Sequence, residues 1–398
     1  MQFVIHLFLN TVIQPMRIYV KSESEQPLGA QVRCIYKNGK KENYQPTIVG
    51  NLPNKPHEQS TYIDIFPKYE IDFLLVWPNG GYWRSVLTNP SDQDTCYCKR
   101  ISNRDKVWWL NALGIRRPIE AKNIKVGVID INNAALKVNS DVTYFQHWQH
   151  SQPGNNGHGS RVCRILTNQQ DNGLVNEGIC NQIDLSFYDT TPPLSKILDN
   201  EKYVSSAIYD GILYLSNDLG VDIICIAGGI YDKRGFDALH RAVKIAQNLG
   251  TLVVAAVGND ASLPCAAPAC FSEVVGVGGL GLKTAYPNNS YAALVADRQI
   301  TERYLTINDN SDWFVSPHCQ NDENVDILAP SIGVTLTFAN DYITDIEGTS
   351  YSCPMIVGLL ASLLSEDGVF SNLKGLERSK YARKAIERIK YGVLYNST

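Results

Sequence analysis

Short apolar runs separated by turn residues fill the first quarter of the chain. Asn38–Gly39 and Asn79–Gly80 lie between such runs and are typical of hairpin turns, because their central residues need a positive φ. No helical period of useful length occurs over residues 17–98. The pattern predicts an accessory all-β sandwich domain over residues 1–98. Its clearest apolar runs are residues 17–20, 30–36, 61–66 and 71–77.

From residue 120 onward, buried strands alternate with amphipathic helices. Apolar runs over residues 124–129, 183–188, 221–227 and 251–257 predict buried parallel strands. Between the last three runs, apolar residues recur at helical spacing, and Gly220 and Gly250 stand where helix C-termini belong. Residues 120–398 therefore predict a doubly wound, mostly parallel α/β sheet. The expected buried helix faces carry Val204, Ala207, Ile208, Gly211, Ile212, Leu215 and Leu219, and Leu239, Ala242, Val243, Ala246 and Leu249.

Residues 99–119 connect these two patterns. They contain the aromatic and apolar run 107–114, with the sequence Val-Trp-Trp-Leu-Asn-Ala-Leu-Gly. The spacing predicts an amphipathic linker helix that docks the two halves of the chain.

Composition and charge narrow the classes of function. The chain has 398 residues, 44% hydrophobic and 19% charged, which excludes an intrinsically disordered protein. A net charge of -4 argues against binding nucleic acid through its phosphates. No run of eighteen apolar residues predicts a membrane span, so no membrane partner is expected. The apolar stretch 3–13 lacks a basic flank and is interpreted as a first strand or an extension ahead of Met16, with a secretory signal as the alternative.

The ten cysteines bear on the cellular compartment of the protein and do not indicate a metal site. Most of them lie in apolar runs, where cysteine behaves as a small hydrophobic residue. No set of His and Cys has the spacing of a zinc site, and whether any cysteines pair stays open. Reduced thiols predict a cytoplasmic protein.

Three polar residues stand at ends of predicted elements. Asp130 follows the strand 124–129, His158 lies at a helix start, and Ser350 precedes a wholly apolar helix. A serine hydroxyl is a weak nucleophile until an imidazole takes its proton, and that imidazole needs a carboxylate to fix its tautomer. The first turn of a buried helix also presents unpaired backbone N–H groups that could bind an oxyanion. Together the three residues predict nucleophilic acyl-transfer chemistry.

The segments around these residues resemble the signature blocks of the subtilisin-like serine peptidases. Residues 126–130 read Val-Gly-Val-Ile-Asp, residues 157–162 read Gly-His-Gly-Ser-Arg-Val, and residues 348–354 read Gly-Thr-Ser-Tyr-Ser-Cys-Pro. A fourth match is the sequence Val-Ala-Ala-Val-Gly-Asn at 254–259. The order Asp, His, Ser is that of this family. The resemblance covers roughly residues 120 to 390.

The resemblance implies a role for each matched residue. It makes Ser350 the nucleophile, His158 the general base and Asp130 the group that orients the imidazole. It makes Asn259 an oxyanion donor together with the Ser350 backbone N–H. The implied substrate-binding residues are Ala227, Gly228, Gly229 and Ala266. Ala266 stands where the family usually has glycine, so the size of the pocket stays open.

Some positions depart from the family pattern. Ile131–Asn132 replaces Ser/Thr-Gly after the aspartate, Arg161 replaces a usual histidine, and Cys163–Arg164 replaces small residues. Cys353 and Met355 replace a small residue and a histidine after the serine. None of these changes removes a group that reacts.

The resemblance implies a serine endopeptidase that acts on a protein or peptide substrate. The family's secreted members typically carry a two-helix propeptide, which residues 17–98 do not match, so a permanent β-domain that positions substrates or docks partners is expected. Limited cleavage of specific partner proteins is the expected activity. The alternatives are a catalytically weakened peptide-binding protein and a scaffold whose β-domain carries the function.

No cofactor or metal is predicted. His147 and His150 flank Trp148, but no third metal ligand accompanies them. The Asp- and Asn-rich stretch 306–324 could supply oxygen ligands for structural calcium, yet it lacks the regular spacing of a calcium loop.

Overall fold

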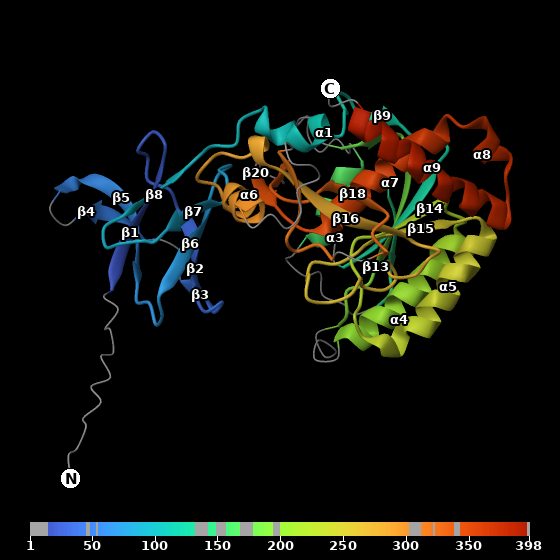
Figure 1. Cartoon of the computed structure of the whole chain (residues 1–398), viewed down its shortest axis with the longest axis horizontal. Helices are drawn as coiled ribbons and strands as arrows, with labels where there is room; N and C mark the ends of the chain where they lie inside the picture. Colours follow the sequence, from blue (N-terminus) through green and yellow to red (C-terminus); the bar gives the residue numbers. More distant parts are fainter. Residues whose placement is uncertain are drawn as a thin grey trace, which may run out of the picture. The chain divides into compact units, whose positions relative to one another are not determined.

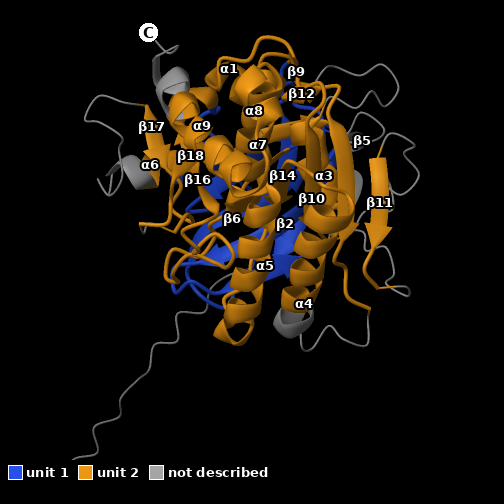
Figure 2. Ribbon diagram, turned by 90° about the vertical axis from the view of Figure 1, so that its right-hand side faces the viewer, with its two compact units in different colours: residues 1–102, 286–295, 340–344 blue, residues 103–285, 296–339, 345–398 orange. Residues whose placement is uncertain are grey.

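The computed structural model describes residues 15–44, 48–52, 55–131, 142–148, 157–167, 178–193, 200–301, 312–320, 323–337 and 343–395. The chain divides into two compact units, which Figure 2 colours separately. Unit 1 comprises residues 1–102, 286–295 and 340–344, and unit 2 comprises the remainder. This division differs from the predicted boundaries, because two later segments group with the N-terminal unit and most of the predicted linker groups with unit 2.

Unit 1 contains two four-stranded β-sheets, with strand orders β4-β5-β1-β8 and β3-β2-β6-β7. Gly39 and Gly80 have φ angles of 79° and 86°, the left-handed conformation that hairpin turns require. One buried cluster takes side chains from both sheets, among them Ile18 of β1 and Val32 of β2. The alternating apolar positions therefore face a shared core. The strands are Met16–Ser22 (β1), Ala30–Tyr36 (β2), Lys41–Tyr44 (β3), Ile48–Leu52 (β4), Lys55–Ile65 (β5), Ile71–Pro78 (β6), Ser85–Thr88 (β7) and Thr95–Cys98 (β8).

Residues 286–295 belong to unit 1 through specific contacts. Ser85 and Ser290 form an isolated β-bridge. The N–H of Tyr291 donates to the carbonyl oxygen of Arg84 at 2.8 Å, and the Arg84 guanidinium lies 5.0 Å from the centre of the Tyr291 ring. Unit 1 is thus built from segments that lie about two hundred residues apart in the sequence.

Unit 2 is built on an eight-stranded sheet with the order β11-β13-β10-β14-β15-β16-β17, in which β18 also pairs with β16. Its pairs are parallel, except that β17 runs antiparallel to β16. Two further pairs, β9 with β12 and β19 with β20, form two-stranded sheets, and the first two residues of β20 are grouped with unit 1. The strands are Ile119–Glu120 (β9), Lys125–Asp130 (β10), Val142–Gln146 (β11), Cys180–Asn181 (β12), Asp184–Asp189 (β13), Ile223–Ile226 (β14), Leu252–Ala256 (β15), Val275–Leu282 (β16), Trp313–Val315 (β17), Ile327–Pro330 (β18), Val334–Thr337 (β19) and Ile343–Ile346 (β20).

Helices cover both faces of this sheet (Figure 1). On one face, α4 and α5 pack on Ile224 and Ile226 of β14 through a large apolar cluster. On the other face lies α7, and its Cys353 contacts Cys225, the residue between those two isoleucines. The helices are Trp108–Ala112 (α1), His158–Leu166 (α3), Asn200–Leu213 (α4), Phe236–Leu249 (α5), Tyr291–Thr301 (α6), Thr349–Ser365 (α7), Gly368–Asn372 (α8) and Gly375–Tyr395 (α9). Of the described helices, none has the length and hydropathy needed to cross a membrane.

Most predicted elements of unit 2 are confirmed, with two corrections. The helix predicted over residues 99–119 spans only α1 and the 3-10 turn Asp105–Val107, because Gly114 takes a left-handed φ of 74° just beyond α1. Leu249, predicted on a buried face, is 46% exposed at the end of α5. The indole N–H groups of Trp108 and Trp109 donate to carbonyl oxygens of Gly333 and Thr335, so α1 docks within unit 2.

Candidate active site

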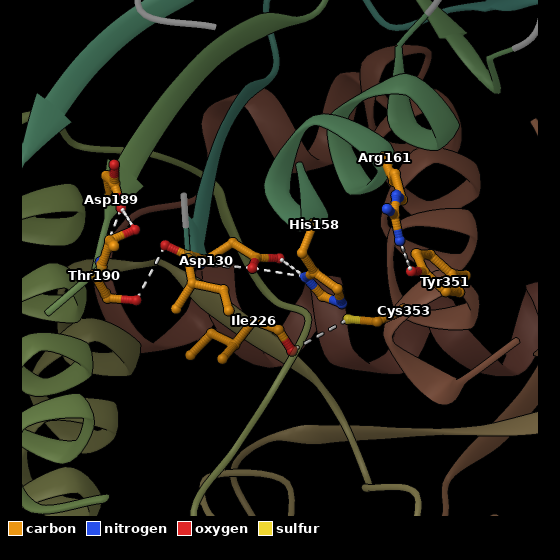
Figure 3. Close-up of polar contacts among 10 residues, drawn as sticks. Asp130, His158, Arg161, Asp189, Thr190, Ile226, Tyr351 and Cys353 are labelled. Atoms are coloured by element: carbon orange, nitrogen blue, oxygen red, sulfur yellow. Dashed lines mark hydrogen bonds and ion pairs between the residues drawn. The ribbon is translucent and has the colours of Figure 1, made fainter. Parts of the chain in front are cut away.

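The alternation of side chains along β10 sets the direction of Asp130. Ile129 packs into the cluster under α4 and α5, so Asp130, the next residue, faces the other side of the sheet. Its carboxylate accepts a hydrogen bond from the N–H of Ile131 at 2.6 Å. Its carbonyl oxygen accepts the Thr190 hydroxyl at 3.0 Å and the Thr190 N–H at 2.8 Å (Figure 3). The carboxylate is therefore fixed at the carboxyl end of a central strand.

His158 is the first residue of α3 and lies against Asp130. Nδ1 of His158 is 2.8 Å and 3.0 Å from the two carboxylate oxygens. The preceding residue, Gly157, has a left-handed φ of 55° that turns the chain into the helix. Burial opposes protonation of the imidazole, but the Asp130 charge and hydrogen bond outweigh it and raise the pKa of His158 above the ordinary value. Nε2 is thereby left for a second partner.

Ser350 is the second residue of α7 and so lies within the first turn of the apolar helix that the sequence predicts after it. It is 8% exposed, and its position in the first turn leaves its N–H without an acceptor inside the helix. The next residue, Tyr351, places its ring 5.6 Å from that of His158, so the starts of α3 and α7 meet. In the described part of the chain, no hydrogen bond joins the Ser350 hydroxyl to His158. Such contacts are often long before substrate binds.

Asn259 lies beside the start of α7, and its amide has a defined orientation. Its Oδ1 accepts the N–H of Thr349 at 2.8 Å and the Thr349 hydroxyl at 3.2 Å. Because a backbone N–H can only donate, the atom facing it must be the amide oxygen. This leaves Nδ2 as a donor beside the start of α7. A Cβ built on Gly348 would lie 3.4 Å from Nδ2, so the donor sits close to this turn.

Tyr231 and Gln320, which the sequence did not single out, contact the loop that carries Asn259. Nε2 of Gln320 donates to the Tyr231 hydroxyl at 2.7 Å and to the Asp260 carbonyl oxygen at 2.9 Å. A Cβ on Gly258 would lie 2.3 Å from the Tyr231 hydroxyl oxygen, so only glycine fits between these groups. No local pattern marks Gln320 in the sequence, because its partners lie 60 and 89 residues away.

The predicted substrate-binding residues lie at the end of β14. Ala227 is buried, whereas Gly228 and Gly229 are exposed. A Cβ on Gly228 would meet no atom within 4 Å, which leaves open space beside the backbone. A Cβ on Gly229 would lie 2.8 Å from the Cβ of Ala266, so Ala266 fills the space next to this strand end.

The remaining predicted features divide between described and undescribed residues. Asn132, His150 and residues 306–311 and 321–322 of the Asp- and Asn-rich stretch lie outside the described residues. His147 contacts the Tyr188 hydroxyl through Nδ1 at 2.7 Å. Among the described residues, no group of three or more His, Cys, Asp or Glu could hold a metal ion. The ten cysteines all lie in the described part of the chain, and none of them forms a disulfide bond there.

Sequence comparison places these residues within a known family. The model of the Subtilase family matches residues 69–386. Subtilisin DY of Bacillus licheniformis is 27% identical over 253 residues, which are 61% of this chain and 77% of that protein. The intracellular serine protease of Paenibacillus polymyxa is 27% identical over 216 residues, which are 52% of this chain and 53% of that protein. The thermophilic serine proteinase of Bacillus sp. (strain AK1) is 26% identical, over 53% of this chain and 43% of that protein.

Solved structures also match the chain. The Prenylagaramide maturation protease PagA is 21% identical, with a TM-score of 0.47, and the match covers 70% of this chain and 88% of that chain. A lanthipeptide protease is 15% identical, with a TM-score of 0.48, over 70% of this chain and 85% of that chain.

Proposed function

The chain belongs to the Subtilase family of serine peptidases, and on that basis we propose that Asp130, His158 and Ser350 form the catalytic triad of an endopeptidase. The single observation that carries the proposal is the contact between Asp130 and Nδ1 of His158 at 2.8 Å and 3.0 Å. It fixes the ring so that Nδ1 carries a proton and Nε2 is the free base.

Ser350 is the proposed nucleophile. Its Oγ attacks the scissile carbonyl carbon while its proton passes to Nε2 of His158. Asp130 stabilises the imidazolium that forms. Collapse of the tetrahedral intermediate breaks the C–N bond, and His158 returns the proton to the leaving amine. Water then hydrolyses the acyl-enzyme by the same route and regenerates the Ser350 hydroxyl.

Asn259 is the proposed side-chain donor to the oxyanion. Because Thr349 occupies its Oδ1, Nδ2 is held as a preorganised donor at the start of α7. The N–H of Ser350 is the second proposed donor, since the first turn of a helix leaves it unpaired. Donors fixed before the reaction stabilise the developing charge without reorganisation.

An extended peptide is the proposed substrate. Residues 227–229 leave β14 with exposed backbone at Gly228 and Gly229, which supports pairing of the substrate strand by β-augmentation. Packing of Ala266 against Gly229 favours a small side chain before the cleaved bond. The restricted pocket supports the proposal of limited cleavage of partner proteins. Docking of these partners through unit 1 is a separate part of the proposal. General digestion of casein with no residue preference would contradict limited cleavage.

The test of the proposed function is labelling with a fluorophosphonate, which reacts with a serine whose base and oxyanion donors are assembled. Wild type should be labelled and Ser350→Ala should not. Ser352→Ala is the matched control, because the Ser352 hydroxyl donates to the carbonyl oxygens of Ala329 and Pro330 inside the core. A folded wild type that is not labelled would overturn the proposal and favour a peptide-binding protein without turnover.

A further inference from the structure

A second polar contact joins the helices that carry His158 and Ser350. Arg161 lies one turn after His158 on α3, and Tyr351 directly follows Ser350 on α7. Nη1 of Arg161 donates to the Tyr351 hydroxyl at 3.3 Å. Figure 3 shows this pair and Asp130 on either side of the His158 ring. The imidazole thus lies between the Asp130 carboxylate from β10 and the Tyr351 ring from α7, whose hydroxyl is bound by Arg161.

We propose that Arg161 and Tyr351 are positioning residues that hold the first turn of α7 against the first turn of α3. The inference rests on the proposed function of His158 and Ser350, and it deepens that function. Neither side chain needs to touch substrate. Their contact would set the separation between the imidazole and the hydroxyl, which decides how readily the proton passes.

The surroundings of the pair support a positioning role. Tyr351 is 5% exposed, so its ring has little freedom to move. Its ring centroid lies 5.6 Å from that of His158 at an interplanar angle of 39°. Arginine suits this place because its planar guanidinium offers several N–H donors and keeps its charge. Arg161 also stands where the resemblance leads one to expect histidine, so the tether is a feature of this chain.

The charge of Arg161 also acts on His158. The groups around the imidazole are Asp130 from β10, Arg161 from α3 and Tyr351 from α7. Burial lowers the pKa of His158, Asp130 raises it, and Arg161 lowers it. Loss of the Arg161 charge should therefore raise the pKa of His158 further. A role in packing alone would not produce this shift.

The two members of the pair can be separated experimentally. Tyr351→Phe removes the hydroxyl and keeps the Arg161 charge, whereas Arg161→Met removes both the contact and the charge. With a peptide ester as substrate, both variants should lose about tenfold in kcat with KM changed less than twofold, the size expected for one lost hydrogen bond to a charged group. Only Arg161→Met should move the acid limb of the pH profile to higher pH.

Arg164→Met is the matched control. Arg164 lies three residues further along α3 and donates to the carbonyl oxygen of Thr337, away from His158. This variant removes the same charge from the same helix. Because Arg164 does not act on His158, the acid limb of the pH profile should stay unchanged. An equal shift in Arg164→Met would show that net charge, and not the position of Arg161, moves the pKa, and would contradict the proposal.

Two measurements keep the proposal independent of turnover. The His158 imidazole can be titrated by NMR in the Ser350→Ala background, where Arg161→Met should raise its pKa and Tyr351→Phe should not. Thermal unfolding of the two single variants and the double variant gives their coupling, which should be clearly non-additive. If the imidazole pKa is unchanged and the unfolding effects are additive, the proposal is wrong, even when the enzyme labels normally. If wild type fails to label while both measurements hold, only the proposed function fails.

Discussion

At the scale of single residues, the environment of His158 predicts the pH dependence of activity. Its pKa lies above the ordinary 6.5, because the Asp130 carboxylate favours the imidazolium more strongly than burial disfavours it. A general base works only when neutral, so kcat/KM should rise with pH through a pKa above that value. The measurement is a pH profile with a peptide ester whose own ionisation lies outside the range.

Removal of the Asp130 charge should shift that profile in the opposite direction. Asp130→Asn removes the interaction that raises the pKa of His158, so the acid limb should move to lower pH. It should also reduce kcat by a factor on the order of 10⁴, the effect of this change in other Ser-His-Asp enzymes, because the imidazole loses its tautomer control. An acid limb that stays in place would exclude His158 as the titrating base.

Asn259 gives a second prediction at this scale. Asn259→Ala should lower kcat on the order of 10²–10³-fold, the range typical for one lost oxyanion donor, with little change in KM. Gln320→Leu, which frees the loop behind Asn259, should lower kcat more modestly. In the Asn259→Ala background the Gln320 change should have no further effect on kcat, because the donor it positions is gone. Additive losses would contradict a role of Gln320 through Asn259.

At the scale of elements, α7 illustrates how close packing places a catalytic serine. Its residues are buried on nearly all sides, in agreement with its apolar sequence. Gly358 lies inside this helix, and a Cβ there would be 2.7 Å from Cγ2 of Ile179. The absence of a side chain allows α7 to approach the segment before β12. This approach fixes the axis of the helix whose first turn carries Ser350.

Gly358→Ala should therefore destabilise the protein although alanine favours helices. Overpacking in a filled core typically costs about 1–3 kcal/mol, which exceeds the gain of up to ~1 kcal/mol in helix propensity. The measurement is urea unfolding. Gly368→Ala at the start of α8 is the control, because a Cβ there meets no atom within 4 Å and stability should stay within about 0.5 kcal/mol. If both variants are as stable as wild type, the Ile179 side chain can move to make room for the added methyl group, and the prediction is wrong.

At the scale of the whole molecule, unit 1 depends on segments from the later part of the chain. Trp83 is fully buried, and its ring lies 6.2 Å from that of Tyr286. Val86 donates to the carbonyl oxygen of Asn289 at 3.0 Å. Residues 286–295 thus find their partners in a segment about two hundred residues earlier in the sequence.

Deletion of residues 1–102 should consequently leave this segment without its partners. Exposed aromatic rings and unpaired backbone groups would lower the melting temperature and promote aggregation. Differential scanning calorimetry and size-exclusion chromatography of the truncated and full chains provide the measurement. A truncated chain that is monomeric and melts at the wild-type temperature would show that residues 1–102 are dispensable for the remainder.

The sequence by itself determined the alternation of strands and helices in unit 2 and the positions of Asp130, His158 and Ser350 at element ends. These follow from local periodicity and from capping residues that act within a few positions. The length of α1 could not be predicted in this way. The aromatic run suggested a longer helix, but its two indoles form hydrogen bonds to Gly333 and Thr335, which lie far away in the sequence.

Only the tertiary structure decided which side chains support the candidate site. The Arg161–Tyr351 contact, the orientation of the Asn259 amide by Thr349, and the Gln320 support all join residues 60 to 190 positions apart. The same holds for the grouping of residues 286–295 with unit 1. Such contacts depend on how separate elements pack together, and hydrogen bonds of this kind leave no period or spacing in the sequence from which they could be inferred.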